Sequence, residues 1–175
     1  MVSSRRPLPP AEVADRLRAQ FGEDLQDAGE AYGHAVVTVA PGRYRELMVV
    51  LRDDPEFDCD YFDFTSAVDY PDREVFELVT HVYSTSWRHH VRVKVPIPRA
   101  EPRIETVSDV YPGANWHERE TWELFGIVFE GHPHLVKLVL PEPFEGHPLR
   151  KDFELMSRVA KPWPGEAEGE EAEEG

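Results

Sequence analysis

The chain contains a single cysteine, Cys59, among its 175 residues. One thiol excludes a disulfide within the chain, and an iron–sulfur cluster held by this chain alone would need about four thiolates. The scarcity is also weakly typical of cytoplasmic proteins. No apolar run approaches the roughly 20 residues that cross a bilayer. The N-terminus, MVSSRRPLPP, lacks the apolar run of a secretory signal. We therefore expect no direct membrane insertion.

Basic residues are scarce too, with 19 Lys and Arg against 34 Asp and Glu, and the net charge is −15. Six glutamates between positions 166 and 174 account for part of this charge, and the rest of the chain still carries about −9. Nucleic acid and anionic lipid surfaces both need clustered basic side chains, so neither is an expected ligand. A partner protein with a basic or mixed surface fits the charge better.

Motifs for independent catalysis are missing. The chain has no GxGxxG, no GxxxxGK[ST] and no GxSxG sequence. Cys59 lies in a predicted acidic strand, which should raise the pKa of its thiol rather than activate it. Glu118 and Glu120 are two positions apart on a predicted helix, so their side chains should diverge instead of sharing a catalytic cleft. We predict no catalytic, metal or cofactor-binding residue in this chain.

Hydrophobic periodicity predicts the secondary structure. Helices are expected at residues 9–21, 43–52 and 114–125, and strands at 34–40, 57–63, 74–84 and 89–97. The last two strands should form a hairpin. Pro96 and Pro98 favour an edge position for its second strand, and His89 and His90 are expected on the solvent surface of that hairpin.

This order of elements predicts an α+β fold, with two layers and a mixed β-sheet that has helices packed on one face. The expected division is an α+β domain at 1–140, an extended docking arm at 141–161 that leaves the domain, and an acidic disordered tail at 162–175.

The helix at 114–125 combines charge with aromatic residues. Trp116, Arg119, Glu120 and Glu123 share one face, which we expect to be exposed, with Arg119 and Glu123 forming an i,i+4 ion pair. The opposite face, which includes Trp122, should dock on the sheet. A solvated amphipathic helix explains most of this pattern. An exposed tryptophan beside arginine, however, is typical of interface hot spots.

The predicted arm carries two groups suited to a partner. The guanidinium of Arg150 matches a partner's carboxylate, and Phe153 is a hydrophobic anchor that an extended arm should not bury against itself. Charge balance with nearby glutamates is the alternative explanation for the basic pair Arg150 and Lys151.

Three histidines, His132, His134 and His147, raise the alternative of a stand-alone metal-dependent hydrolase. Pro133 separates the first two, and His117-Glu118 lacks the second histidine of an HExxH motif. A third alternative is a generic acidic binding module.

Two stretches, ERETWELFGIVFEGHPHL from residue 118 and FEGHPLRKDF from residue 144, closely resemble one family. The chain is similar to the C subunit of the proton-pumping NADH:quinone oxidoreductase, respiratory complex I, whose module also occurs in related membrane-bound dehydrogenases and hydrogenases. Residues expected at an interface with other subunits are Trp116, Glu118, Arg119, Glu120, Trp122, Glu123, Gly131, His132, Pro133, Gly146, Pro148, Leu149, Arg150, Lys151, Asp152 and Phe153.

The resemblance implies a hydrophilic scaffold protein that binds no flavin or iron–sulfur cluster itself. Its expected partners are the D subunit, which forms much of the quinone cavity, and the B subunit, which holds a cluster. The assembly would transfer electrons from NADH through FMN and iron–sulfur centres to quinone and couple this transfer to proton translocation. The chain would lie at the cytoplasmic face of the cell membrane, held there by its partners.

Overall fold

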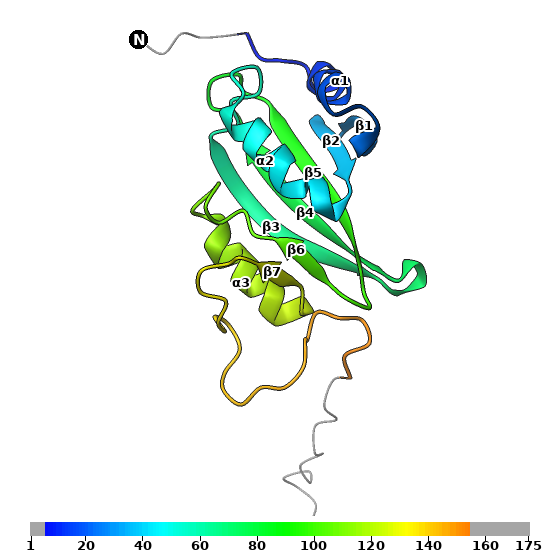
Figure 1. Ribbon diagram of the computed structural model, residues 1–175, viewed down its shortest axis with the longest axis vertical. Coiled ribbons are helices and arrows are strands. Elements are labelled where there is room, and N and C mark those ends of the chain that lie inside the picture. Colours follow the sequence, from blue (N-terminus) through cyan, green and yellow to red (C-terminus); the bar gives the residue numbers. More distant parts are fainter. Residues whose placement is uncertain (1–5, 155–175) are drawn as a thin grey trace, which may run out of the picture.

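The computed structural model describes residues 6–154 (Figure 1). The predicted tail at 162–175 and the end of the predicted arm lie outside this range. No helix in the described range is both long and apolar enough to span a membrane. The elements in chain order are α1 (Pro10–Phe21), β1 (Leu25–Ala31), β2 (His34–Val39), α2 (Tyr44–Asp53), β3 (Tyr61–Tyr70), β4 (Val75–Tyr83), β5 (His90–Pro98), β6 (Arg103–Glu105), α3 (Ala114–Phe125) and β7 (Val128–Glu130), with short 3-10 turns at Gly22–Asp24, Pro41–Arg43 and Pro71–Arg73.

Five strands form a mixed sheet in the order β1-β2-β5-β4-β3. The pairing of β2 with β5 is parallel, and the other three pairings are antiparallel. The short strands β6 and β7 pair in parallel beside α3. The predicted α+β class with a mixed sheet is confirmed, as are the three helices and the β4–β5 hairpin.

One face of the sheet carries all three helices. Val91, Val93 and Val95 of β5 alternate into this face and are fully buried. Tyr44 of α2 reaches the same face, where its hydroxyl lies 2.9 Å from that of Thr80 on β4. Phe125 of α3 packs edge-on against Phe76 of β4, with 6.2 Å between ring centroids. The helices therefore share a single core, as the predicted two-layer arrangement requires.

Strand β1 was not predicted. Only Leu25 and Ala28 among its residues are buried, because β1 is an edge strand with polar residues toward solvent. Its link to β2 is a two-residue turn in which both Tyr32 and Gly33 have positive φ, 54° and 76°. Such a turn matches the twist of antiparallel strands, and the Tyr-Gly pair was the available signal.

The prediction that β5 is an edge strand is wrong, since β5 lies between β2 and β4. β2 pairs only with the segment from Val91 to Lys94. Pro96 and Pro98 lie beyond the end of β2, where the missing N–H groups interrupt no ladder on that side. The two prolines therefore lie where the neighbouring strand β2 has ended, and not at the edge of the sheet.

Two further local predictions fail. Residues 57–60 form no strand; Asp58 has a φ of 46°, and Cys59 is buried before β3 begins. Burial, reinforced by the adjacent carboxylates, raises the pKa of the Cys59 thiol, as expected. His89 was expected in solvent but is 2% exposed, with its Nε2 3.6 Å from the Cys59 sulfur. The end of the hairpin at His89 therefore faces the core and not the solvent.

The buried hydroxyl of Tyr44 provides a test of the core. Thr80 contacts both Tyr44 and the hydroxyl of Thr65, at 2.9 and 2.7 Å. We expect Tyr44→Phe to lower the free energy of unfolding by about 1 kcal/mol, because one buried hydrogen bond is lost without a change in packing. Chemical denaturation measures it. Tyr32→Phe, at a side chain that is 91% exposed, is the matched control and should leave stability unchanged.

Candidate subunit interface

Helix α3 is the element around which the candidate interface is built. It runs from Ala114 to Phe125 and ends at Gly126, which adopts φ 78°. The Gly126 N–H closes the last turn on the carbonyl of Trp122 at 2.8 Å. A side chain at Gly126 would be strained at this φ and would also collide with His147 and Arg150. The helix end thus requires glycine for two independent reasons.

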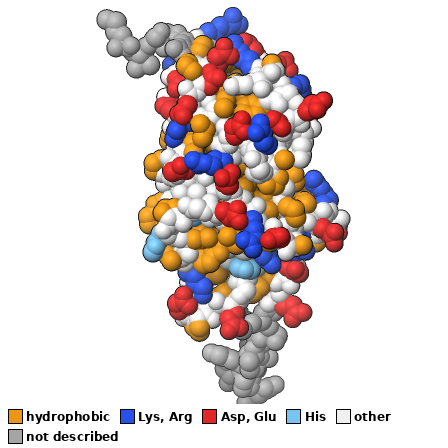
Figure 2. Space-filling model, in the orientation of Figure 1, with side chains coloured by type: hydrophobic (Ala, Val, Ile, Leu, Met, Phe, Trp, Pro, Cys, Tyr) orange, Lys and Arg blue, Asp and Glu red, His pale blue; other side chains and the backbone are white. Residues whose placement is uncertain are grey.

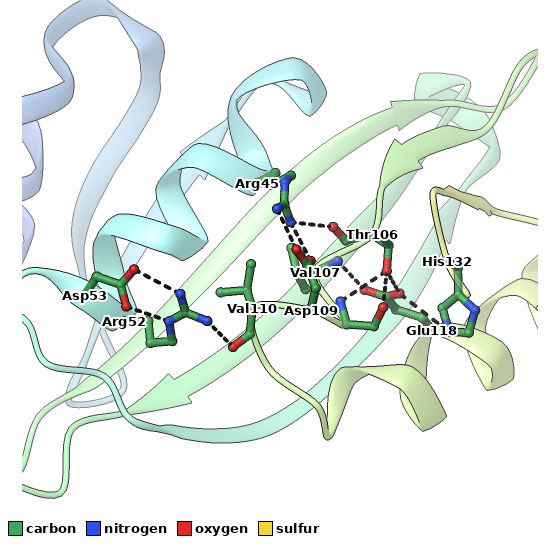
Figure 3. A network of polar contacts seen from close by, with 10 residues as sticks. Arg45, Arg52, Asp53, Thr106, Val107, Asp109, Val110, Glu118 and His132 are labelled. Carbon is green, nitrogen blue, oxygen red and sulfur yellow. Dashed lines mark hydrogen bonds and ion pairs between the residues drawn. The ribbon is translucent and has the colours of Figure 1, made fainter. Parts of the chain in front are cut away.

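Glu118 fixes the inner face of α3 (Figure 3). Its carboxylate is fully buried and accepts hydrogen bonds from the Thr106 hydroxyl and, at 2.8 Å, from the Val107 N–H. On the other side of this connecting segment, Arg45 of α2 forms two bonds to Asp109, at 2.6 and 2.7 Å. Residues 106–109 are therefore held between α2 and α3.

The burial of Glu118 changes its proton affinity. Removal from water raises the pKa of this carboxyl from 4.5 to about 7, although its two hydrogen bonds favour the ionised form. Glu120 is exposed, so the two carboxylates diverge as predicted. A shared acid–base pair is excluded by this geometry.

The outer face of α3 holds the loop that follows β7. Glu123 accepts three backbone N–H groups, from Leu138, Val139 and Leu140, at 2.7–2.8 Å. Burial alone would raise the pKa of Glu123, but these three donors outweigh it and lower the pKa below its usual value. Arg119 donates to the carbonyls at 136 and 137, both at 3.0 Å.

These bonds correct two predictions. Glu123 was expected on an exposed face but is 3% exposed, because the loop covers it. The predicted ion pair between Arg119 and Glu123 is replaced by bonds from each residue to the loop backbone. A helical wheel could not show this, since the covering loop has no periodic pattern of its own.

The segment at 147–150 caps the C-terminal end of α3. The His147 ring N–H donates to the carbonyl of Glu123 at 2.8 Å, and the Leu149 N–H donates to that of Leu124 at 3.1 Å. Arg150 Nε donates to the carbonyl of Phe125 at 2.5 Å. Together with the Gly126 bond, all four terminal carbonyls of the helix have partners. These are the groups that a helix end leaves unsatisfied.

Residues 141–154 contain no helix or strand, yet they do not leave the body as predicted. Asp69 of β3 accepts the Lys151 N–H at 2.8 Å, and Arg99 bridges Asp69 and Asp152 at 3.0 Å each. The guanidinium of Arg150 lies 5.2 Å from the ring centre of Phe76 on β4. Arg150 thus bonds the chain's own helix through Nε, whereas its predicted contact with a partner's carboxylate stays a prediction.

Phe153 is also held within the chain. Its ring stacks on that of Phe144 with 5.9 Å between centroids, and a side chain on Gly146 would press on it at 3.0 Å. Phe153 is half-buried by these contacts. The expectation that this segment could not cover Phe153 is therefore wrong, and the tight turn at Gly146 is what permits the contact.

Helix α3 and the segments that follow it also expose apolar side chains. Five large hydrophobic side chains on them are 39–58% exposed: Trp116, Val136, Leu138, Val139 and Leu149, which we call the apolar docking surface. The Arg119 guanidinium lies 5.2 Å from the Trp116 ring. Figure 2 shows hydrophobic side chains interleaved with charged ones on one face of the molecule. Exposed apolar side chains that include an aromatic and arginine pair are typical of protein interfaces.

Residues 37–159 match the family described as the respiratory-chain NADH dehydrogenase, 30 kDa subunit. The chain belongs to this family. The C subunit of NADH-quinone oxidoreductase from Roseiflexus castenholzii is 42% identical over 144 residues, which cover 82% of this chain and 83% of that protein. The corresponding protein from Acidothermus cellulolyticus is 43% identical over 150 residues, covering 82% and 78%.

Solved structures show the same fold. A trypsin-resistant fragment of Nqo5, 30% identical, superposes with a TM-score of 0.60 and covers 70% of this chain and 96% of the fragment. A chain of an archaeal membrane-bound sulfane sulfur reductase is similar in fold, with a TM-score of 0.64, 23% identity, and coverage of 93% of this chain and 95% of that one. Membership in the complex I family overturns the alternative of an acidic module unrelated to respiration.

The histidine alternative fails on geometry. His132 Nε2 lies 3.2 Å from the carbonyl of Asn115, His147 bonds the end of α3, and His134 is exposed. Within residues 6–154 these three imidazoles do not converge on a common point; the histidines that do converge are His34, His81 and His90. The predicted hydrolase centre at His132, His134 and His147 is therefore not formed.

The other family-motif residues divide into buried supports and exposed positions. Trp122 is half-buried against the core, whereas Glu120, Pro133 and Lys151 are exposed. Gly131 has a φ of 80°, and Pro148 is half-buried beside Leu149. Sequence reasoning missed Val136, Leu138 and Val139 of the docking surface, because an apolar run more commonly indicates a buried strand.

Glu118 should give the protein a specific pH dependence. Its folded pKa of about 7 exceeds the usual 4.5, so it stabilises the fold at low pH, and this contribution is lost as pH rises from about 4.5 to about 7. At 1.36 kcal/mol per pH unit, the loss is at most about 3 kcal/mol. Glu118→Gln, which retains the shape of the protonated acid, should therefore gain stability relative to the parent across this window.

The measurement is denaturant unfolding of both proteins between pH 4.5 and 7.5. Histidines far from Glu118 change the stability of both proteins equally. His132, whose Nε2 lies 3.9 Å from the Glu118 carboxylate, is coupled to it, so the difference reports this pair. Glu120→Gln, two residues away and exposed, is the control. Its free energy of unfolding should vary with pH as that of the parent does. A Glu118→Gln curve that also ran parallel would contradict an elevated pKa.

Gly126→Ala tests the capped helix end. The positive φ alone should cost about 1 kcal/mol or more, and displacement of His147 and Arg150 should free the segment that follows. We expect lower stability and faster tryptic cleavage after Arg150 and Lys151. Gly42→Ala is the matched control, because a side chain at Gly42 meets no atom within 4 Å. Unchanged cleavage in Gly126→Ala would show that the cap does not hold the segment.

Proposed function

We propose that this chain is a scaffold protein of the peripheral arm of NADH:quinone oxidoreductase, with no flavin or iron–sulfur cluster of its own. It binds neighbouring subunits through the apolar docking surface and contributes no reacting group. The complex transfers electrons from NADH through FMN and iron–sulfur centres to quinone and couples the transfer to proton translocation. The chain lies at the cytoplasmic face of the membrane, held there by its partners.

The observation that carries this proposal is an exposed apolar surface on a rigidly braced loop. Trp116, Val139 and Leu149 are each at least 50% exposed. Exposure of this kind normally marks a contact with another protein. The backbone beneath Val139 and Leu149 is fixed by bonds to Glu123 and Leu124. A surface prepared in this way loses little conformational entropy on binding.

The proposed partners are the two neighbours that the family resemblance implies, namely the protein that forms the quinone cavity and the small protein that holds an iron–sulfur cluster. This assignment rests on family membership together with the location of the surface on α3 and the family-motif loop. The low cysteine content of the chain supports the absence of its own cluster, because a cluster needs about four thiolates.

The family motif then has two kinds of residue. His147, Arg150 and Gly126 shape the loop from within, through bonds to the end of α3 or the space beside it. Trp116 and Leu149 face outward from the same helix and loop. Substitution of the first kind should disturb folding as well as assembly, whereas substitution of the second kind should disturb assembly alone.

A double variant, Trp116→Ala with Leu149→Ala, tests the proposal. If these are hot spots, each truncation should cost about 2 kcal/mol of binding. We expect less intact complex on native gels of membranes from cells that carry the variant, and a proportional fall in NADH-driven quinone reduction. Mass spectrometry of the purified parent complex identifies the neighbours after cross-linking.

The control is Tyr32→Ala, at an aromatic side chain that is 91% exposed, in the turn between β1 and β2. It should leave assembly intact. The isolated double variant must also unfold at the same denaturant concentration as the parent, which separates binding from folding. Full assembly of the double variant would overturn the proposed surface. Cross-links from Trp116 to neither the quinone-cavity protein nor the cluster-bearing protein would overturn the proposed partners.

A further inference from the structure

Three histidines meet on the sheet face opposite the helices. His34 begins β2, His90 begins β5 and His81 lies in β4. Because Ala35 pairs with Val91, His34 and His90 are lateral neighbours. His90 pairs with Tyr83, which places His81 two residues along the same face. The buried valines of β5 point the other way, into the core.

The imidazoles lie close together and nearly parallel. Ring centroids are separated by 5.0 Å for His34 and His81, 4.7 Å for His34 and His90, and 5.2 Å for His81 and His90. One ring nitrogen from each residue lies within 4.8 Å of the other two. Partial burial of three imidazoles costs hydration, which a shared ligand would offset.

Two of the ring nitrogens are buried without a partner. Among the residues that the structure describes, neither His81 Nε2 nor His90 Nδ1 has a hydrogen-bond partner, although both are shielded from solvent. A buried polar atom without a partner loses its bond to water and gains none in return. Two such atoms in one cluster therefore indicate that something else bonds them in the functional protein.

Asp63 determines which nitrogen of His81 is available. The Asp63 carboxylate lies 2.8 Å from His81 Nδ1, which therefore carries the proton, and Nε2 retains a free lone pair. A carboxylate that orients a histidine in this way is the usual outer contact of a metal ligand. Burial and the neighbouring imidazoles also lower the pKa of His34 and of His90.

We propose that His34, His81 and His90 bind one divalent transition-metal ion of the zinc type, with water in the fourth position. Three neutral imidazoles are a ligand set that zinc accepts. Asp63 supplies an orienting negative charge. Arg92, whose Nη2 lies 3.4 Å from His34 Nδ1, is a nearby positive charge that weakens the site.

Binding requires only a local adjustment. In a tetrahedral site with Zn–N distances of about 2.1 Å, the ligand nitrogens lie about 3.4 Å apart. The present nitrogens, within 4.8 Å, must approach by roughly 1 Å, and the half-buried side chains of His34 and His90 can rotate to do so. The ion would tie three strands together on the face that the helices leave uncovered. This role is independent of the docking surface on α3.

The test uses the full chain without a histidine tag. Equilibrium dialysis against Zn²⁺ followed by elemental analysis should find one equivalent bound per chain. Co²⁺ in its place should show the visible absorption of tetrahedral coordination. Both signals should disappear in His34→Gln and in His90→Gln. Asp63→Asn, which removes only the orienting carboxylate, should weaken binding about 10–100-fold.

His134→Gln is the matched control, since His134 is exposed and lies outside the cluster, and it should bind zinc like the parent. Circular dichroism must show that each variant is folded. Failure of the parent chain to bind zinc would overturn the proposal, as would binding that His34→Gln and His90→Gln leave unchanged. The latter result would assign the ion to other groups, such as the glutamates between positions 166 and 174.

Discussion

The backbone carbonyls at the end of α3 impose the constraint on which the family-specific half of the structure depends. A helix that ends without capping leaves carbonyls exposed or unsatisfied. Here a segment more than twenty residues downstream supplies the missing donors, from His147, Leu149 and Arg150. The segment is therefore ordered by the helix, and the helix end is completed by the segment.

Acidic residues of α3 organise its two sides in the same way. Glu118 accepts donors from the connection that precedes the helix, and Glu123 accepts three from the loop that follows it. The pKa values of these two glutamates shift in opposite directions. Glu118 has too few donors to offset burial, so its pKa rises, whereas Glu123 has three N–H groups and its pKa falls.

The periodic elements could be predicted from the sequence, but contacts made by irregular chain could not. Helices 10–21, 44–53 and 114–125 and the β4–β5 hairpin follow from hydrophobic spacing. Strand β1 lacked this signal because only two of its residues are buried. The burial of Glu123 and the inward bonds of Arg150 arise from a loop that folds back across the helix, and spacing within either segment carries no information about their meeting.

Because the loop folds back across α3, some residues of the family motif contact the chain itself. A motif rich in charge and aromatic rings suggests a surface offered to partners, and for Trp116 this interpretation matches the exposure. Arg150 instead donates to the chain's own backbone and covers the Phe76 ring. Its planar guanidinium can do both at once, which a lysine ammonium cannot. The specificity of the motif therefore reflects the geometry of a folded loop at least as much as recognition.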